Sequence, residues 1–169
     1  MTMSAAPVLT ASDISLRYPG ESRPVLGHFD FALEAAETVS ILGPSGVGKS
    51  SLLRVLGGLQ TPTGGEVAMS GTPVQGVHPR VASAFQDPSL LPWLTLEKNV
   101  AFGLDFKYQP ELSRAESQSR IDRAIDEVGL SHARRYYPAQ LSGGMAQRTA
   151  LARCLARKPE ILLLDEPFG

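Results

Sequence analysis

The stretch GPSGVGKS, residues 43–50, limits the possible folds of this chain more than any other part of the sequence. It matches the pattern G-x-x-x-x-G-K-[ST]. The β-branched run ETVSILG before it predicts a short strand buried on both faces, and Leu52, Leu53, Val55 and Leu56 after it predict a helix. Strand, Gly-rich loop and helix in this order are typical of a phosphate-binding loop. The alternative is a plain Gly-rich turn, which these flanks disfavour.

Each part of this loop has a physical role in binding phosphate. Gly43, Gly46 and Gly48 let the backbone curl, so that successive N–H groups and the start of the helix converge on phosphate oxygens. Lys49 adds a positive charge, and the Ser50 hydroxyl can reach Mg²⁺. We expect nucleotide contacts from one continuous set of residues: Gly43, Pro44, Ser45, Gly46, Val47, Gly48, Lys49, Ser50 and Ser51.

Two adjacent acids follow the apolar run ILLL at residues 161–164. A buried strand that runs parallel to the strand before the loop would set its carboxyl end beside the phosphates. We expect Asp165 to bind Mg²⁺ there and Glu166 to polarise the attacking water. The alternative is that the two acids simply end a strand in solvent, although charges so close to a buried strand call for a cation.

The sequence LSGG, residues 141–144, predicts a second anion site. Ser142 is a good N-cap, and Gly143 and Gly144 leave the first N–H groups of the following helix uncovered. One nucleotide-binding loop does not need a second anion site. A plain capped helix is the alternative at this position.

The rest of the sequence predicts an α/β fold. Alternating apolar residues at 8–18 and 29–33 indicate an antiparallel hairpin, and short strands are expected at 66–70 and 81–85. Helical periodicity covers residues 121–128, with a capping-box spacing at Ser113 and Glu116 and a stop at Gly129. Another helix starts at Ser142 and ends before Pro159.

We therefore predict a P-loop NTPase core with an N-terminal antiparallel β subdomain and a helical insertion. Residues 1–86 and 158–169 would form the β subdomain and the core, and residues 87–157 would form the helical subdomain. A hydrophobic fraction of 43% is enough for a buried core. The net charge of −1 argues against nucleic acid as a partner.

These motifs together resemble one family, the nucleotide-binding subunits of ABC transporters. The resemblance rests on an aromatic residue on the early strand (Tyr18), the phosphate loop, Gln86 after a strand, the LSGG signature, and Asp165 with Glu166, in the family's order. It implies that Tyr18 stacks on adenine and that Gln86 contacts Mg²⁺ and the attacking water. It also implies that Ser142, Gly143 and Gly144 close over the γ-phosphate bound by a second subunit.

The resemblance further implies a function. The stretch QDPSLLPWLTLEKNVAFGL is similar to that of bacterial importers of nitrate, sulfonates, taurine and related solutes. Such a subunit hydrolyses ATP with Mg²⁺ in a head-to-tail pair, binds a transmembrane permease at the inner face of the membrane, and is served indirectly by a solute-binding protein. We therefore expect a cytoplasmic protein that lies at the membrane through the permease.

Two alternatives remain open. One is a soluble ABC ATPase of DNA repair or translation, although the long coiled-coil insertion of that class is absent. The other is an inactive nucleotide-binding fragment. Members of the family continue beyond this point with a D-loop and a switch His, and His28, His78 and His132 do not match that His. We thus expect a truncated form with little or no turnover. Met145 also stands where many relatives carry Gln.

The segment Leu90, Leu91, Pro92 and Trp93 is expected to form part of the surface that receives the permease. Large apolar residues in a loop are costly to expose, and an exposed aromatic side chain is a common interface anchor. The alternative is that Trp93 packs into the helical insertion.

Overall fold

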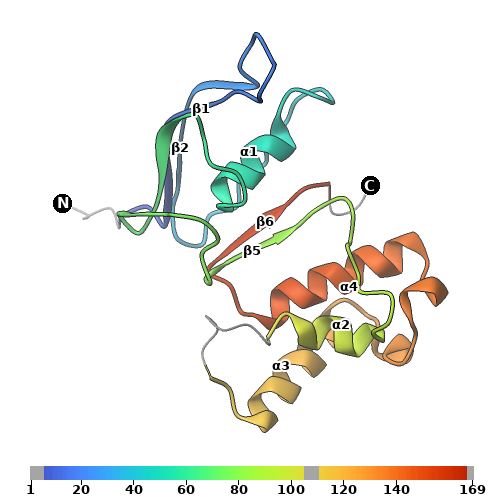
Figure 1. Ribbon diagram of the computed structural model, residues 1–169. Coiled ribbons are helices and arrows are strands. Elements are labelled where there is room, and N and C mark those ends of the chain that lie inside the picture. Colours follow the sequence, from blue (N-terminus) through green and yellow to red (C-terminus); the bar gives the residue numbers. More distant parts are fainter. Residues whose placement is uncertain (1–5, 105–110, 167–169) are drawn as a thin grey trace. The chain divides into compact units, whose positions relative to one another are not determined.

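The computed structural model describes residues 6–104 and 111–166, and the chain divides into two compact units, Met1–His78 and Pro79–Gly169 (Figure 1). Each unit is described by itself. The predicted division at residues 86–87 and 157–158 stays a prediction. No helix in the described residues is both long and apolar enough to cross a membrane.

The first unit is built on a four-stranded antiparallel sheet with the order β2-β1-β3-β4. In β1, Leu9 lies opposite Leu33 of β2 on one side and Met69 of β3 on the other. The predicted hairpin is thus confirmed. The strands of this sheet are β1 (Leu9–Leu16), β2 (Leu26–Leu33), β3 (Gly64–Met69) and β4 (Thr72–Pro73).

Helix α1 (Lys49–Leu56) follows the phosphate loop, as predicted. Its buried side chains are Leu52, Leu53, Val55 and Leu56. This spacing places them on one face of the helix, which is why the short segment is stable as a helix in the folded unit.

The strand predicted at residues 37–43 is not formed. These residues have no regular secondary structure, and Val39 and Leu42 are 43% and 91% exposed. An extended segment becomes a buried strand only where neighbouring strands bond to its backbone, and the four-stranded sheet of this unit does not include it. The final strand, which was expected to run parallel to a strand at this segment, pairs with β5 in the described sheets.

The second unit contains a two-stranded parallel sheet and a group of helices (Figure 1). Strand β5 pairs with β6 in register from Val81 opposite Ile161 to Ala84 opposite Leu164. Helix α4 contacts β5 on one side and the two other α-helices on the other. The elements are β5 (Val81–Ala84), α2 (Leu96–Phe102), α3 (Arg114–Glu127), the 3₁₀ turns Ser131–Ala133 and Pro138–Gln140, α4 (Gly143–Ala156) and β6 (Ile161–Leu164).

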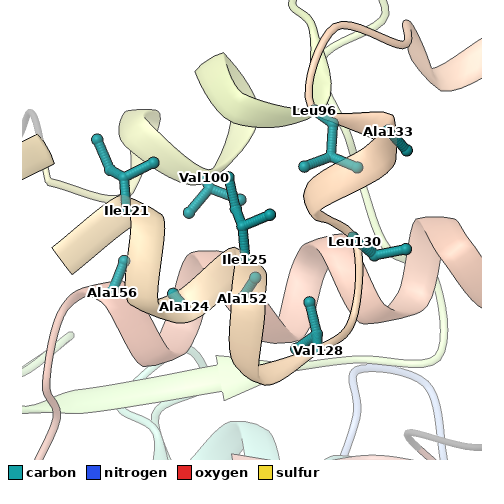
Figure 2. Packing of buried hydrophobic residues seen from close by; sticks show 10 residues of the cluster. All are labelled: Leu96, Val100, Ile121, Ala124, Ile125, Val128, Leu130, Ala133, Ala152 and Ala156. Carbon is teal, nitrogen blue, oxygen red and sulfur yellow. The ribbon is translucent and has the colours of Figure 1, made fainter. Parts of the chain in front are cut away.

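A single apolar cluster holds the helices of this unit together (Figure 2). Its members come from all three α-helices and from the chain after α3, and each is at most 9% exposed. Small side chains on α4 let α3 approach its axis closely, while the branched side chains of α2 and α3 fill the space between. The cluster consists of Leu96, Val100, Ile121, Ala124, Ile125, Val128, Leu130, Ala133, Ala152 and Ala156.

The predicted signals at the ends of α3 are confirmed. The Ser113 hydroxyl accepts from the Glu116 N–H at 3.2 Å, and the Glu116 carboxylate accepts from the Ser113 N–H at 3.1 Å. The Ser113 hydroxyl also lies 2.8 Å from the Glu116 carboxylate and donates to it. This bond, and after it the bond from the Ser113 N–H, lower the pKa of Glu116 because they stabilise its ionised form. At the other end, Gly129 has φ 70°, a left-handed conformation that glycine adopts without strain.

Candidate nucleotide-binding site

The phosphate loop owes its shape to glycine at two positions. Gly46 and Gly48 have φ values of 79° and 105°, in the region that side chains rarely allow. At Gly48 a Cβ atom would also lie 3.0 Å from Val25 Cγ1 and 3.1 Å from the Val25 carbonyl oxygen. Only glycine therefore fits at Gly48, which is the residue immediately before α1.

The ammonium group of Lys49 lies over the loop itself. Its Nζ donates to the carbonyl oxygens of Gly43 and Pro44, both at 2.9 Å. A positive charge is thereby held at the centre of a backbone curve that ends in a helix N-terminus, and both features favour an anion. The loop fits a polyphosphate on this ground.

Tyr18 is connected to the helix that follows the loop. Its hydroxyl lies 3.0 Å from the Ser51 hydroxyl, a hydrogen bond between residues 33 positions apart. The side chain of Tyr18 is partly buried. The structure thus brings together Tyr18 and the loop residues from 43 to 51, all in the first unit.

The predicted acidic residues and Gln86 lie at the carboxyl ends of the paired parallel strands β5 and β6. The Asp165 N–H donates to the Ala84 carbonyl at 2.9 Å, which continues the ladder beyond the strands. Asp165 is 7% exposed, whereas Glu166 and Gln86 are exposed. Glu166 has φ 47°, so the chain bends immediately after Asp165. Gln86 therefore follows the carboxyl end of β5, and Asp165 and Glu166 follow that of β6.

The signature residues form the predicted helix start. The Ser142 hydroxyl accepts from the Met145 N–H at 3.3 Å, and α4 begins at Gly143. A Cβ atom on Gly143 or Gly144 would meet nothing within 4 Å, so the backbone is open to a partner on this side.

The site residues are divided between the two units. The loop and Tyr18 belong to the first, whereas Gln86, Asp165, Glu166 and the signature belong to the second. The described residues contain no group of three His, Cys, Asp or Glu that could hold a metal ion. Mg²⁺ bound with nucleotide needs only one or two protein oxygens and keeps several waters. Asp165 in the second unit is a carboxylate of the type that Mg²⁺ accepts, and Ser50 in the first unit is a hydroxyl of that type.

Two residues important for the second unit were not predicted. Asn99 is fully buried; its Oδ1 accepts from the Leu91 N–H at 2.8 Å, and its Nδ2 donates to the Leu91 and Leu94 carbonyls at 3.1 and 3.0 Å. Arg153 on α4 donates to two carbonyls in the segment after β5. An Asn between two core positions of an apolar helix face was a possible signal for Asn99. No residue pattern in the sequence indicated the contacts of Arg153, because its partners are backbone carbonyls.

The alternative considered for Trp93, that it packs into the helical insertion, is wrong. Its side chain is 69% exposed, although the flanking Leu91 and Leu94 carbonyls are fixed by Asn99. Trp93 therefore projects from a loop whose backbone is firmly held.

An α/β fold with a phosphate-binding loop followed by a helix defines the class of phosphate-loop NTPases. Within that class the chain belongs to the ABC transporter family, whose profile matches residues 26–169. This confirms the resemblance inferred from the motifs.

The similar curated proteins are ATP-binding or transport proteins of bacteria. The taurine import ATP-binding protein TauB of Chromobacterium violaceum is 45% identical over 95% of this chain and 60% of that protein. The aliphatic sulfonates import ATP-binding protein SsuB 1 of Xanthomonas axonopodis is 44% identical over 95% of this chain and 64% of that protein. The nitrate transport protein NasD of Klebsiella oxytoca is 39% identical over 96% of this chain and 63% of that protein. The chain thus spans less than two thirds of the length of these relatives.

Solved structures of ATP-binding cassettes share the fold. A cassette in a dimeric post-hydrolysis state bound to ADP and Pi matches with a TM-score of 0.84 and 32% identity, over 95% of this chain and 74% of that one. A second dimeric structure of the same bacterial cassette matches with a TM-score of 0.84 and 33% identity, over 95% of this chain and 75% of that one.

Proposed function

We propose that this chain is the ATP-binding part of a subunit that powers a bacterial ABC importer by hydrolysing ATP. One observation carries the proposal. A chain of the ABC transporter family combines a glycine-shaped phosphate loop holding Lys49 with two adjacent acids, Asp165 and Glu166, at the end of a parallel strand. The loop with Lys49 would bind phosphate, and the two acids would bind Mg²⁺ and activate the attacking water for hydrolysis.

In this proposal the first unit binds the nucleotide. The backbone N–H groups of residues 43–51 and the Lys49 ammonium hold the phosphates, because they offer donors and positive charge to an anion. The Tyr18 ring stacks on adenine, and its hydroxyl is oriented by Ser51 at 3.0 Å.

The second unit supplies the groups for hydrolysis. Asp165 and Ser50 would hold Mg²⁺, which when bound would neutralise phosphate charge. Glu166 accepts a hydrogen bond from the attacking water and orients it, and Gln86 contacts that water and the metal site. The buried position of Asp165 and the exposed position of Glu166 support these separate roles.

The working unit is a head-to-tail pair of chains. Ser142, Gly143 and Gly144 of one chain would close over the γ-phosphate held by the other, which gives the open helix start of α4 its anion. The dimeric state of the matched cassettes supports this arrangement.

The transported solute belongs to the group of taurine, sulfonates, nitrate and related small solutes. The names of the similar proteins support this assignment. The subunit would bind a membrane permease at the inner face of the membrane and would work indirectly with a solute-binding protein.

Phosphate release by the purified full-length protein tests the enzymatic part. We expect release that scales with protein concentration and that stops when EDTA removes Mg²⁺, because phosphate charge is then no longer neutralised. A Glu166→Gln sample serves as the blank. Release that is equal in the blank, or unaffected by EDTA, would contradict the assignment.

Trp93→Ala tests the transport part. We expect five- to tenfold weaker binding of the permease, about 1 to 1.4 kcal/mol, because an exposed aromatic anchor is lost from a fixed loop. Co-purification and surface plasmon resonance with the cognate permease would measure it. Leu59→Ala, which removes a side chain 52% exposed in the first unit, is the control. Unchanged permease binding by Trp93→Ala would exclude Trp93 from the interface.

A further inference from the structure

The segment that leaves β5 is tied to α4 by one side chain. Arg153 Nη2 donates to the Pro88 carbonyl at 2.8 Å, and Arg153 Nη1 donates to the Ser89 carbonyl at 3.2 Å. The planar guanidinium presents its donors in a fixed geometry, so two neighbouring carbonyls bound to it are held more rigidly than by a single bond. Arg153 therefore connects this segment to the helix that begins with the signature.

The conformation of the segment is fixed from within as well. Ser89 has φ 44°, a left-handed conformation that is costly for a residue with a side chain. The Asp87 carboxylate accepts from the Ser89 N–H at 2.8 Å. A conformation of this kind persists only where its surroundings over-determine it, and the two bonds from Arg153 are part of those surroundings.

Burying the charged guanidinium of Arg153 costs free energy of desolvation. Burial lowers the pKa of its guanidinium, because desolvation disfavours the charged form. No carboxylate forms an ion pair with it in the part of the chain that the structure describes. Its stem lies against Gly103, where a Cβ atom would be 3.0 Å from Arg153 Cγ. The backbone carbonyls of the segment are thus its charge-stabilising partners.

Gln86 lies in the short span between two anchored points. On one side the Ala84 carbonyl accepts from the Asp165 N–H at 2.9 Å, and on the other the Pro88 carbonyl accepts from Arg153 at 2.8 Å. Within the described residues the Gln86 side chain makes no hydrogen bond. Its position relative to Asp165 therefore depends on the backbone at these two points.

We propose that Arg153 is a positioning residue, which fixes Gln86 relative to Asp165 and Glu166 by holding the Pro88 and Ser89 carbonyls on α4. The inference rests on the proposed function, in which Gln86 contacts the attacking water and the metal site. Through Arg153 the place of Gln86 depends on the helix that carries Ser142, so a displacement of that helix changes the arrangement of the groups for hydrolysis.

A double-mutant cycle in the full-length protein tests this inference. Arg153→Lys keeps the charge and most of the stem but loses the paired donors. It should lower kcat by roughly three- to tenfold and leave KM for ATP within about twofold. In a Gln86→Ala background the same substitution should lower kcat by less than about twofold, because the positioned group is gone. Arg153→Met should lower kcat further, and this loss too should shrink in the Gln86→Ala background. Thermal melting shows whether each variant is folded.

A matched control comes from the same helix. Arg157 Nη2 donates to the Pro79 carbonyl at 2.9 Å, before β5. Arg157→Lys should leave kcat within about twofold in both backgrounds. Equal losses of kcat from Arg153→Lys in the two backgrounds would show a purely structural role and overturn the inference alone. If Gln86→Ala alone leaves kcat unchanged, Gln86 has no role to position, and the inference about Arg153 is overturned while the proposed ATP hydrolysis stands. Absence of turnover in the wild-type protein would overturn the proposed function and the inference with it.

Discussion

Replacing Glu166 by Gln in the full-length protein is expected to lower phosphate release by about 10² to 10⁴-fold while ATP remains bound. Glutamine has almost the same shape but cannot accept a proton from the attacking water. The groups proposed to hold the phosphates lie at residues 43–51 and are not altered. The closed pair of chains should accumulate, because ATP that binds across the interface stabilises the pair and is no longer consumed.

Two measurements check this result. Phosphate release with saturating ATP and Mg²⁺ gives the rate, and sedimentation gives the fraction of paired chains. Asp126→Asn, which removes an exposed carboxylate at the end of α3, is the control for loss of an acid elsewhere. A Glu166→Gln protein that stays monomeric with ATP and Mg²⁺ would count against the head-to-tail pair. One that keeps wild-type turnover would exclude Glu166 as the group that activates water.

Lys49→Ala is expected to weaken ATP binding by at least tenfold, about 1.4 kcal/mol. The ammonium is the positive charge that the loop carries at its centre, where its Nζ contacts the Gly43 and Pro44 carbonyls. Its removal leaves the phosphates with backbone donors only. It also leaves two loop carbonyls without their donor, so the loop loses part of its shape.

Isothermal titration calorimetry with ATP and Mg²⁺ measures this loss. Lys98→Ala is the matched control, because Lys98 is an exposed lysine on α2 in the other unit. The control should retain wild-type affinity. Equal ATP affinity in the wild-type and Lys49→Ala proteins would exclude the loop as the phosphate site.

Local signals in the sequence predicted several parts of the molecule correctly. The capping pair Ser113 and Glu116, the stop at Gly129 and the N-cap Ser142 were predictable because each depends on residues within four positions of one another. The hairpin of β1 and β2 was predictable for a similar reason, since its alternation reflects one buried face.

Features that depend on distant partners were not predictable in this way. The run at residues 37–43 has strand propensity, but backbone partners decide whether a strand forms, and none of the described strands pairs with it. Arg153 contacts carbonyls 64 and 65 positions away. Backbone carbonyls are present at every residue, so no side-chain pattern marks their partner. The roles of the individual site residues stay predictions.

The Cys154 thiol lies at the contact between α4 and β5, so its chemical reactivity reports whether this contact is closed. Its Sγ lies 3.4 Å from the Ser83 carbonyl, and burial raises the pKa of the thiol. Alkylating reagents attack the exposed thiolate, so modification requires α4 to separate from β5. Because the chain has one cysteine, the rate of alkylation reports this opening at a single known place without any engineered label.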